Sequence, residues 1–120
     1  MTADPFYEHP RMREAQRAME AALARVLPRL PAEVRSFVAD ECRFLSLLGG
    51  KPYGHCADGL ITLALSQLSD TEADCVVAHE IAHAWLGHGP MPDGAQRERQ
   101  EREAQEQAAA WGFPDFRLSA

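Results

Sequence analysis

Residues 73–86 constrain the fold of this chain more than any other segment, because a helix built from them would be apolar on almost every side. The apolar side chains in this stretch are Ala73, Val76, Val77, Ala78, Ile81, Ala82, Ala84, Trp85 and Leu86. Ser69 and Glu72 fit a capping box before the helix, and Gly87 and Gly89 end it. A helix that is apolar all round is buried centrally, so the rest of the chain must pack around this one.

Two further helices are predicted on either side of this central helix. Residues 11–27 place apolar side chains at three- and four-residue steps, so one face of this N-terminal helix should pack on the core. Residues 94–111 should form the last helix, which begins with a second capping box made by Asp93 and Gln96. Because the connection between the central and last helices is short, the two should pack as antiparallel neighbours.

The β-structure is predicted from short apolar runs that are bounded by turn residues. Such runs at 42–48 and 60–65 indicate two strands, and the segment 52–56 between them is either a loop or a third short strand. The expected architecture is therefore one α+β domain over residues 1–120, with an N-terminal helix, a small β-sheet, the central helix and a C-terminal helix.

Charge and cysteine content exclude several classes of protein. Eighteen acidic and twelve basic side chains give a net charge of −6, which provides no basic face for nucleic acid. The chain begins without a basic, apolar leader and contains no run of about 18 apolar residues, so neither a signal peptide nor a membrane span is expected. The three cysteines, Cys42, Cys56 and Cys75, lack the spacing of a disulfide framework, which favours a reduced, cytoplasmic protein.

The central helix carries two histidines with metal-ligand spacing. His79 and His83 are four residues apart, so both imidazoles leave the same face of the helix about 6 Å apart along its axis. Two such nitrogens can each reach a zinc ion at about 2.0–2.1 Å. Glu80 lies about 100° round the helix from His79, close enough to hydrogen-bond a water on that ion without ligating it. Without a metal, this apolar helix would bury three polar side chains at a cost.

A third protein ligand has several candidates. His88 comes one residue too early for the pattern in which a third histidine follows on the same helix, and none of the three cysteines lies in a recognisable ligand pair. In the last helix, Glu101 lies at the edge of the apolar stripe, whereas Glu103 is about 200° away from Glu101 around the helix. Helix phase therefore favours Glu101, and the alternative for this residue is a surface ion pair with Arg97.

The sequence His79-Glu80-Ile81-Ala82-His83, followed by a helix containing Glu101-Arg102-Glu103-Ala104-Gln105, resembles the gluzincin clan of zinc metallopeptidases. In layout it is most similar to the minimal gluzincins (minigluzincins) and the ImmA/IrrE family. The resemblance covers about residues 59–113. It implies a zincin-like fold.

The resemblance also implies a role for each site residue. His79, His83 and Glu101 would bind zinc, Glu80 would be the general base, and the strand at 60–65 would be the sheet edge on which an extended peptide lies. Two departures concern the residues around the metal. Gln105 stands where relatives carry Asp or Asn, and the later His or Tyr that stabilises the oxyanion is missing unless His88, Tyr53 or an arginine replaces it.

These inferences predict a zinc-dependent metallopeptidase that acts on a peptide or protein substrate. One alternative is a catalytically weak or inactive zinc-bound module that binds peptides without cutting them, and another is a zinc hydrolase for a non-peptide amide. The segment 113–120 is expected to be pinned to the core by Phe113 and Phe116, or to fold over the cleft and keep the enzyme latent. The sequence leaves the substrate and the oligomeric state open.

Overall fold

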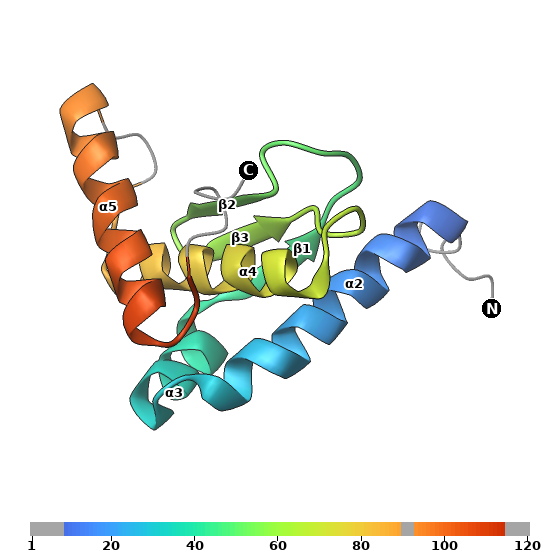
Figure 1. Cartoon of the computed structure of the whole chain (residues 1–120), viewed down its shortest axis with the longest axis horizontal. Helices are drawn as coiled ribbons and strands as arrows, with labels where there is room; N and C mark the ends of the chain where they lie inside the picture. The colour runs from blue at the N-terminus through green and yellow to red at the C-terminus, as the bar shows by residue number, and fades with distance from the viewer. Residues whose placement is uncertain (1–8, 90–92, 115–120) are drawn as a thin grey trace.

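The computed structural model describes residues 9–89 and 93–114 and has the predicted α+β class (Figure 1). The elements are α2 (Pro10–Val26), a 3-10 turn (Leu27–Arg29), α3 (Ala32–Glu41), β1 (Arg43–Ser46), β2 (Gly54–Ala57), β3 (Leu60–Leu63), α4 (Asp70–Trp85) and α5 (Gly94–Ala110). The segment 52–56, which was predicted as either a loop or a third strand, contains most of β2. Helix α3, which follows the 3-10 turn, has ten residues.

The three strands form one sheet with the order β1-β3-β2. β3 pairs with β1 in parallel and with β2 in the antiparallel direction, so it is the central strand. The prediction that the strand at 60–65 is a free edge is therefore wrong. Both sides of its backbone are already hydrogen-bonded, and the edges of the described sheet are β1 and β2.

A two-residue turn explains why β2 and β3 are neighbours. Asp58 and Gly59 connect the strands, and both have positive φ, at 51° and 82°. Such a turn has the twist that suits a hairpin, and Asp-Gly is one of its preferred sequences. A side chain at Gly59 would place its Cβ 2.3 Å from the Glu41 carbonyl oxygen, so the end of α3 also requires glycine there.

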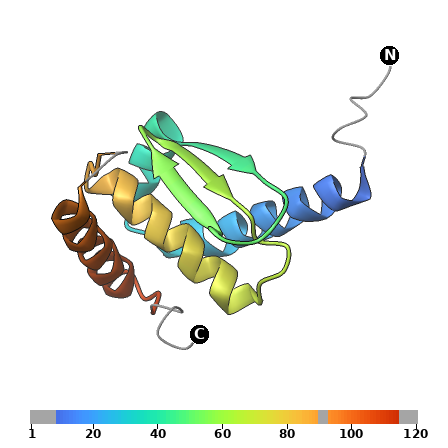
Figure 2. The same ribbon diagram turned by 90° about the horizontal axis from the view of Figure 1, so that it is seen from above.

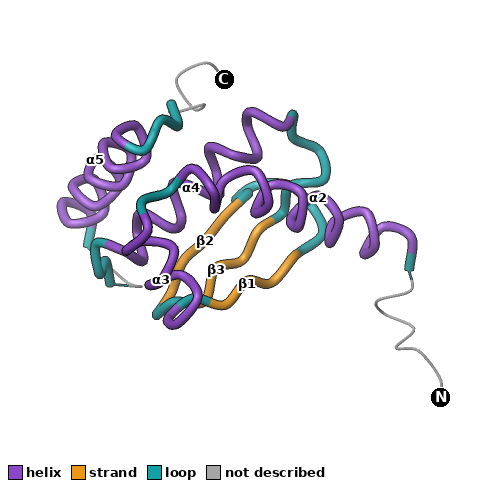
Figure 3. Tube along the Cα trace, turned by 90° about the horizontal axis from the view of Figure 1, so that it is seen from below, coloured by secondary structure: helices purple, strands orange, loops and turns teal. Residues whose placement is uncertain are grey.

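Helices α2 and α4 cover one face of the sheet, as the views from above and below show (Figures 2 and 3). The predicted apolar face of α2 is buried through Met12, Ala15, Met19, Ala22 and Val26. Its side chains share one cluster with those of β3 and α4, in which Ile61, Leu63 and Ile81 are fully buried. On the opposite face of the sheet, Leu45 and Leu60 are 43% and 46% exposed.

The two site helices begin as the sequence predicted. Ser69 accepts from the Glu72 backbone and Glu72 accepts from the Ser69 backbone, which completes the first capping box. Asp93 and Gln96 form the same arrangement at the start of α5. Helix α5 packs against α4, as predicted. The two helices are inclined to each other in Figure 1, and in Figure 2 they run side by side in opposite directions.

The two aromatic side chains that were predicted to pin the C-terminal segment to the core have different outcomes. Phe113 is buried in the core cluster, as expected, whereas Phe116 and the rest of residues 115–120 lie outside the described residues. The latency hypothesis for this tail therefore stays a prediction. Within residues 9–89 and 93–114, no helix has the length and apolarity needed to cross a membrane.

Candidate metal centre

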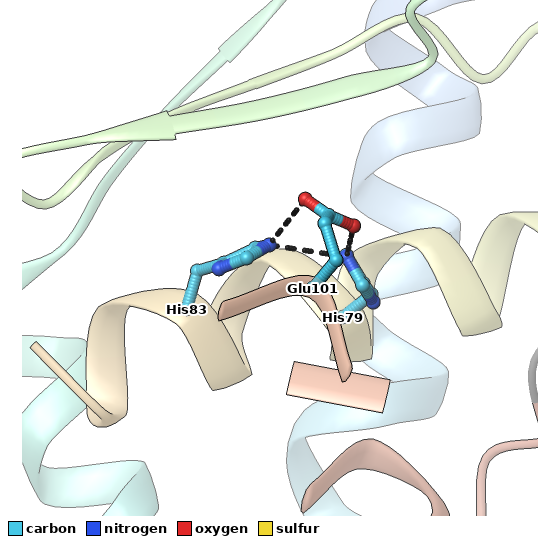
Figure 4. Close-up of side chains that lie close together, drawn as sticks. All are labelled: His79, His83 and Glu101. Atoms are coloured by element: carbon cyan, nitrogen blue, oxygen red, sulfur yellow. Dashed lines mark hydrogen bonds and ion pairs between the residues drawn. The ribbon is translucent and has the colours of Figure 1, made fainter. Parts of the chain in front are cut away.

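Helix α4 places two imidazoles side by side in a partly buried position. His79 and His83 point the same way one turn apart, and their Nε2 atoms are 3.1 Å apart (Figure 4). Their side chains are only 14% and 12% exposed. The helix beneath them is anchored in the core by the side chains of Val77 and Ile81, both fully buried, so the core fixes the direction in which the two rings leave α4.

Helix α5 brings a carboxylate to the same point. Glu101 Oε2 lies 3.0 Å from His79 Nε2, and Glu101 Oε1 lies 3.1 Å from His83 Nε2 (Figure 4). The burial of Ala104 and Ala108 sets the phase of the helix that produces this contact. The hydrogen bonds from the two imidazoles lower the pKa of Glu101 far below its ordinary value, so this carboxylate is charged at neutral pH.

The geometry of these three side chains fits a metal ion. His79, His83 and Glu101 each offer one ligand atom, and these atoms lie within 4.8 Å of one another. Two ligands held about 2.0–2.1 Å from a tetrahedral zinc stand about 3.3–3.4 Å apart. The 3.1 Å between the two Nε2 atoms is close to that separation. Two histidines and one glutamate are also a donor set used by catalytic zinc sites, which leave the fourth position open.

Glu80 lies beside this cluster, on the side of α4 that faces β2. Glu80 is 8% exposed, and strand β2 passes close to it at Gly54. A Cβ added at Gly54 would lie 2.8 Å from Glu80 Cγ and 2.8 Å from Val76 Cγ1, so only glycine allows this approach. Cys56 lies two residues after Gly54 in β2. The pKa of its thiol is raised to about 11, mainly by burial and next by the charge of Glu80. The role of Glu80 as a base is not tested by these contacts and stays a prediction.

The cluster opens into a cleft of about 780 Å³ that β2, α4 and α5 line. His79, Glu80, His83 and Glu101 all contribute to its wall. Other lining side chains that can donate or accept hydrogen bonds include Lys51, Tyr53, His55, Glu72, His88, Arg97, Gln100 and Gln105. The cleft therefore combines the candidate metal ligands, a buried carboxylate and several polar groups at one edge of the sheet.

The other candidate ligands lie outside this cluster, although His88, Cys56 and Cys75 line the same cleft. Within the described part of the chain, the His79, His83 and Glu101 cluster contains neither His88 nor any of the three cysteines. Glu103 also stays outside it, as helix phase predicted, and instead places Oε1 2.8 Å from His88 Nε2. The ligand roles themselves stay predictions, although the structure brings together the three side chains for which they were predicted.

Two features of the site were missed in the sequence. The first is the approach of β2 through Gly54, for which the Asp58-Gly59 turn gave a signal, because it predicts a hairpin whose first strand contains Gly54. The second is a contact between His83 Nδ1 and His88 Nδ1, which are 2.8 Å apart. Its signal is Gly87, because a glycine just after a helix brings the following residue back over the last turn.

A comparison with protein families agrees with this geometry. Residues 43–120 match the model of the IrrE N-terminal-like domain, a family named Peptidase_M78. The chain belongs to this family. The match begins at β1 and includes the sheet, α4 and α5, so it contains the whole candidate metal centre, while α2 and α3 precede it.

Membership in the IrrE N-terminal-like family confirms the ImmA/IrrE part of the predicted resemblance and supports a peptidase class for the chain. A search of curated proteins and a search of solved structures each found no match.

Proposed function

We propose that this IrrE-like chain is a zinc-dependent metallopeptidase of the gluzincin type. The observation that carries the proposal is the convergence of His79 Nε2, His83 Nε2 and the Glu101 carboxylate in a cleft that Glu80 also lines. Two neutral imidazoles and a carboxylate are a donor set that suits zinc. The family, which is named as a peptidase family, supports peptide hydrolysis as the reaction.

In this proposal each residue has one role. His79, His83 and Glu101 hold the ion, which when bound lowers the pKa of a coordinated water to about 7 and polarises a carbonyl group. Glu80 accepts a proton from the water and passes it to the leaving amine. Its burial against β2 suits this task, because a carboxylate that is shielded from solvent and fixed in position transfers protons along one direction.

The corrected sheet order supports a position for the substrate. The backbone of β3 is paired on both sides, whereas β2 is the edge strand that lines the cleft. An edge strand can bind an extended peptide by strand addition, since its free N–H and C=O groups pair with the peptide backbone. We therefore place an extended peptide or protein segment along Gly54–Ala57, with its scissile bond facing Glu80.

The cleft also contains donors for the oxyanion that forms during peptide hydrolysis. Tyr53, His55 and Arg97 line it, so the absence of a later His or Tyr in the sequence does not leave the site without donors. We favour Tyr53 or Arg97 in this role. The rival function, a zinc-bound module that binds peptides without cutting them, becomes an outcome of the test below.

The test compares the zinc-loaded protein with its Glu80→Gln variant on a broad peptide library, with zinc content measured for both. We expect the variant to keep its zinc and to lose at least about 100-fold in turnover, as removal of a general base does. Glu106→Gln, which changes an exposed glutamate of α5, is the matched control and should cut at the native rate. Equal cleavage by Glu80→Gln would contradict the role of Glu80. Peptide binding without cleavage by the native protein would instead favour the interaction module.

A further inference from the structure

Helix α4 ends in a backbone motif that returns the chain onto His83. The Gly87 N–H donates to the Ala84 carbonyl at 3.1 Å, and the His88 N–H donates to the His83 carbonyl at 3.1 Å. Gly87 has φ of +70°, the left-handed conformation that this pair of hydrogen bonds requires. This is a Schellman motif, in which the residue after the glycine packs on the residue five positions before it.

In most Schellman motifs the two packed side chains are apolar, whereas here both are histidines. His83 Nδ1 and His88 Nδ1 are 2.8 Å apart, a hydrogen-bonding distance, and the rings meet edge to face with centroids 5.0 Å apart. The second nitrogen of His88, Nε2, lies 2.8 Å from Glu103 Oε1 on α5. The His88 side chain is 8% exposed and that of Glu103 is 46% exposed, so the contact with His83 is partly buried, whereas the contact with Glu103 reaches solvent.

We propose that His88 and Glu103 are positioning residues that hold His83 in the tautomer whose Nε2 can bind the metal. The inference rests on the proposed function, because it requires a metal at His83 Nε2. It concerns a different nitrogen of the ring, the Nδ1 that faces away from the His79, His83 and Glu101 cluster.

The two contacts fix the direction of each hydrogen bond. Glu103, as a carboxylate, only accepts, so His88 donates its Nε2–H to it. A neutral His88 then has a lone pair on Nδ1, which accepts the Nδ1–H of His83. With its hydrogen on Nδ1, His83 presents the Nε2 lone pair to the cluster. A hydrogen-bonded partner on the far nitrogen of a ligating histidine fixes the ring and raises its basicity.

The Schellman motif makes this arrangement independent of the metal. Backbone hydrogen bonds set the position of His88, and α5 sets that of Glu103, so the ring of His83 is oriented before an ion arrives. Helix α5 thereby contributes to the site twice. Glu101 faces the ligating nitrogens of α4, and Glu103, two residues later, acts on the opposite side of His83 through His88.

Zinc affinity, measured by competition with a chromophoric chelator, tests the pair without any peptidase assay. His88→Ala should weaken zinc binding about 10- to 100-fold, the range found when outer hydrogen-bond partners of metal ligands are removed. His88→Asn, whose side-chain oxygen can accept near the position of Nδ1, should recover most of the loss. Glu103→Ala should weaken binding by a smaller factor, and the exposed Glu106→Ala should leave it unchanged.

Nitrogen-15 NMR of the zinc-loaded native protein gives a readout that packing alone does not predict. We expect the His88 hydrogen on Nε2 and a slowly exchanging Nδ1–H on His83, which becomes fast-exchanging in His88→Ala. A hydrogen on His88 Nδ1 would overturn the inference. So would native-like zinc affinity in His88→Ala, or an equal loss in His88→Asn and His88→Ala. Each of these results leaves native zinc binding, and hence the proposed function, intact, whereas a native protein that binds no zinc overturns both.

Discussion

Helices α4 and α5 resemble each other in length and in the way they start, but the protein holds them differently. They have 16 and 17 residues, and each begins with a reciprocal capping box. Eight residues of α4 are buried, including a glutamate, whereas the buried residues of α5 are Ala104 and Ala108. The candidate metal centre draws ligands from both helices, so it joins a helix fixed by the core to one fixed by much less apolar contact.

This difference suggests how the site is divided between stability and function. The buried apolar side chains of α4, such as Val77 and Ile81, belong to the core cluster, whereas His79 and His83 line the cleft. In α5, Ala104 and Ala108 are buried, and the side chain of Glu101 reaches His79 and His83 of α4. We therefore expect substitutions of the buried apolar side chains of α4 to change stability, and substitutions of the cleft-lining glutamate of α5 to change metal binding with little effect on stability.

The largest expected effects come from one substitution in each helix. Ile81→Ala should lower the free energy of unfolding by about 2–5 kcal/mol, because it leaves a cavity at a fully buried position. Glu101→Ala should strongly reduce zinc affinity while changing the unfolding free energy of the metal-free protein by less than about 1 kcal/mol, as for a partly exposed ion pair. Urea unfolding of the metal-free proteins and chelator competition measure the two quantities.

The comparison between the helices fails if these two variants behave alike. A loss of several kcal/mol in Glu101→Ala would show that this carboxylate supports the fold as much as the core does. Native zinc affinity in Glu101→Ala would remove α5 from the metal centre.

A smaller effect is expected from the two capping residues, which form the same hydrogen bonds at the two helix starts. Ser69→Ala and Asp93→Ala should each cost about 1 kcal/mol of helix stability. Since α4 unfolds only with the core, Ser69→Ala should lower the global free energy of unfolding. Asp93→Ala should mainly increase amide hydrogen exchange in the first turns of α5, where local opening is easier. Equal losses of global stability in both variants would contradict the division between the helices.

Much of the fold could be predicted because its signals are local. The capping boxes at Ser69 and Asp93 and the three- and four-residue periodicity of α2 each depend on residues within one helix, and the structure confirms them. The position of β3 within the sheet depends on pairing between distant segments, and the apolar run at 60–65 carries no information about its neighbours. The Asp58-Gly59 turn was the one local signal for that pairing, because it joins β3 to β2.

The same distinction applies to the site. The common face of His79 and His83 follows from helix geometry alone, and the phase of Glu101 follows from its place beside Ala104 and Ala108. The inclination of α5 to α4 that Figure 1 shows could not be derived, since a short connection limits the distance between two helices but not their angle. The contact of His88 with His83 required recognition of Gly87 as the left-handed residue of a helix end.

The zinc content of the purified protein tests the central claim most directly, namely that His79, His83 and Glu101 form a metal centre. Plasma mass spectrometry on the native protein should find about one zinc per chain, as expected for a site with three protein ligands and one open position. The double variant His79→Ala/His83→Ala should contain none while keeping the helical content of the native chain. Full zinc occupancy in that double variant, or a native protein that takes up no zinc, would contradict the account.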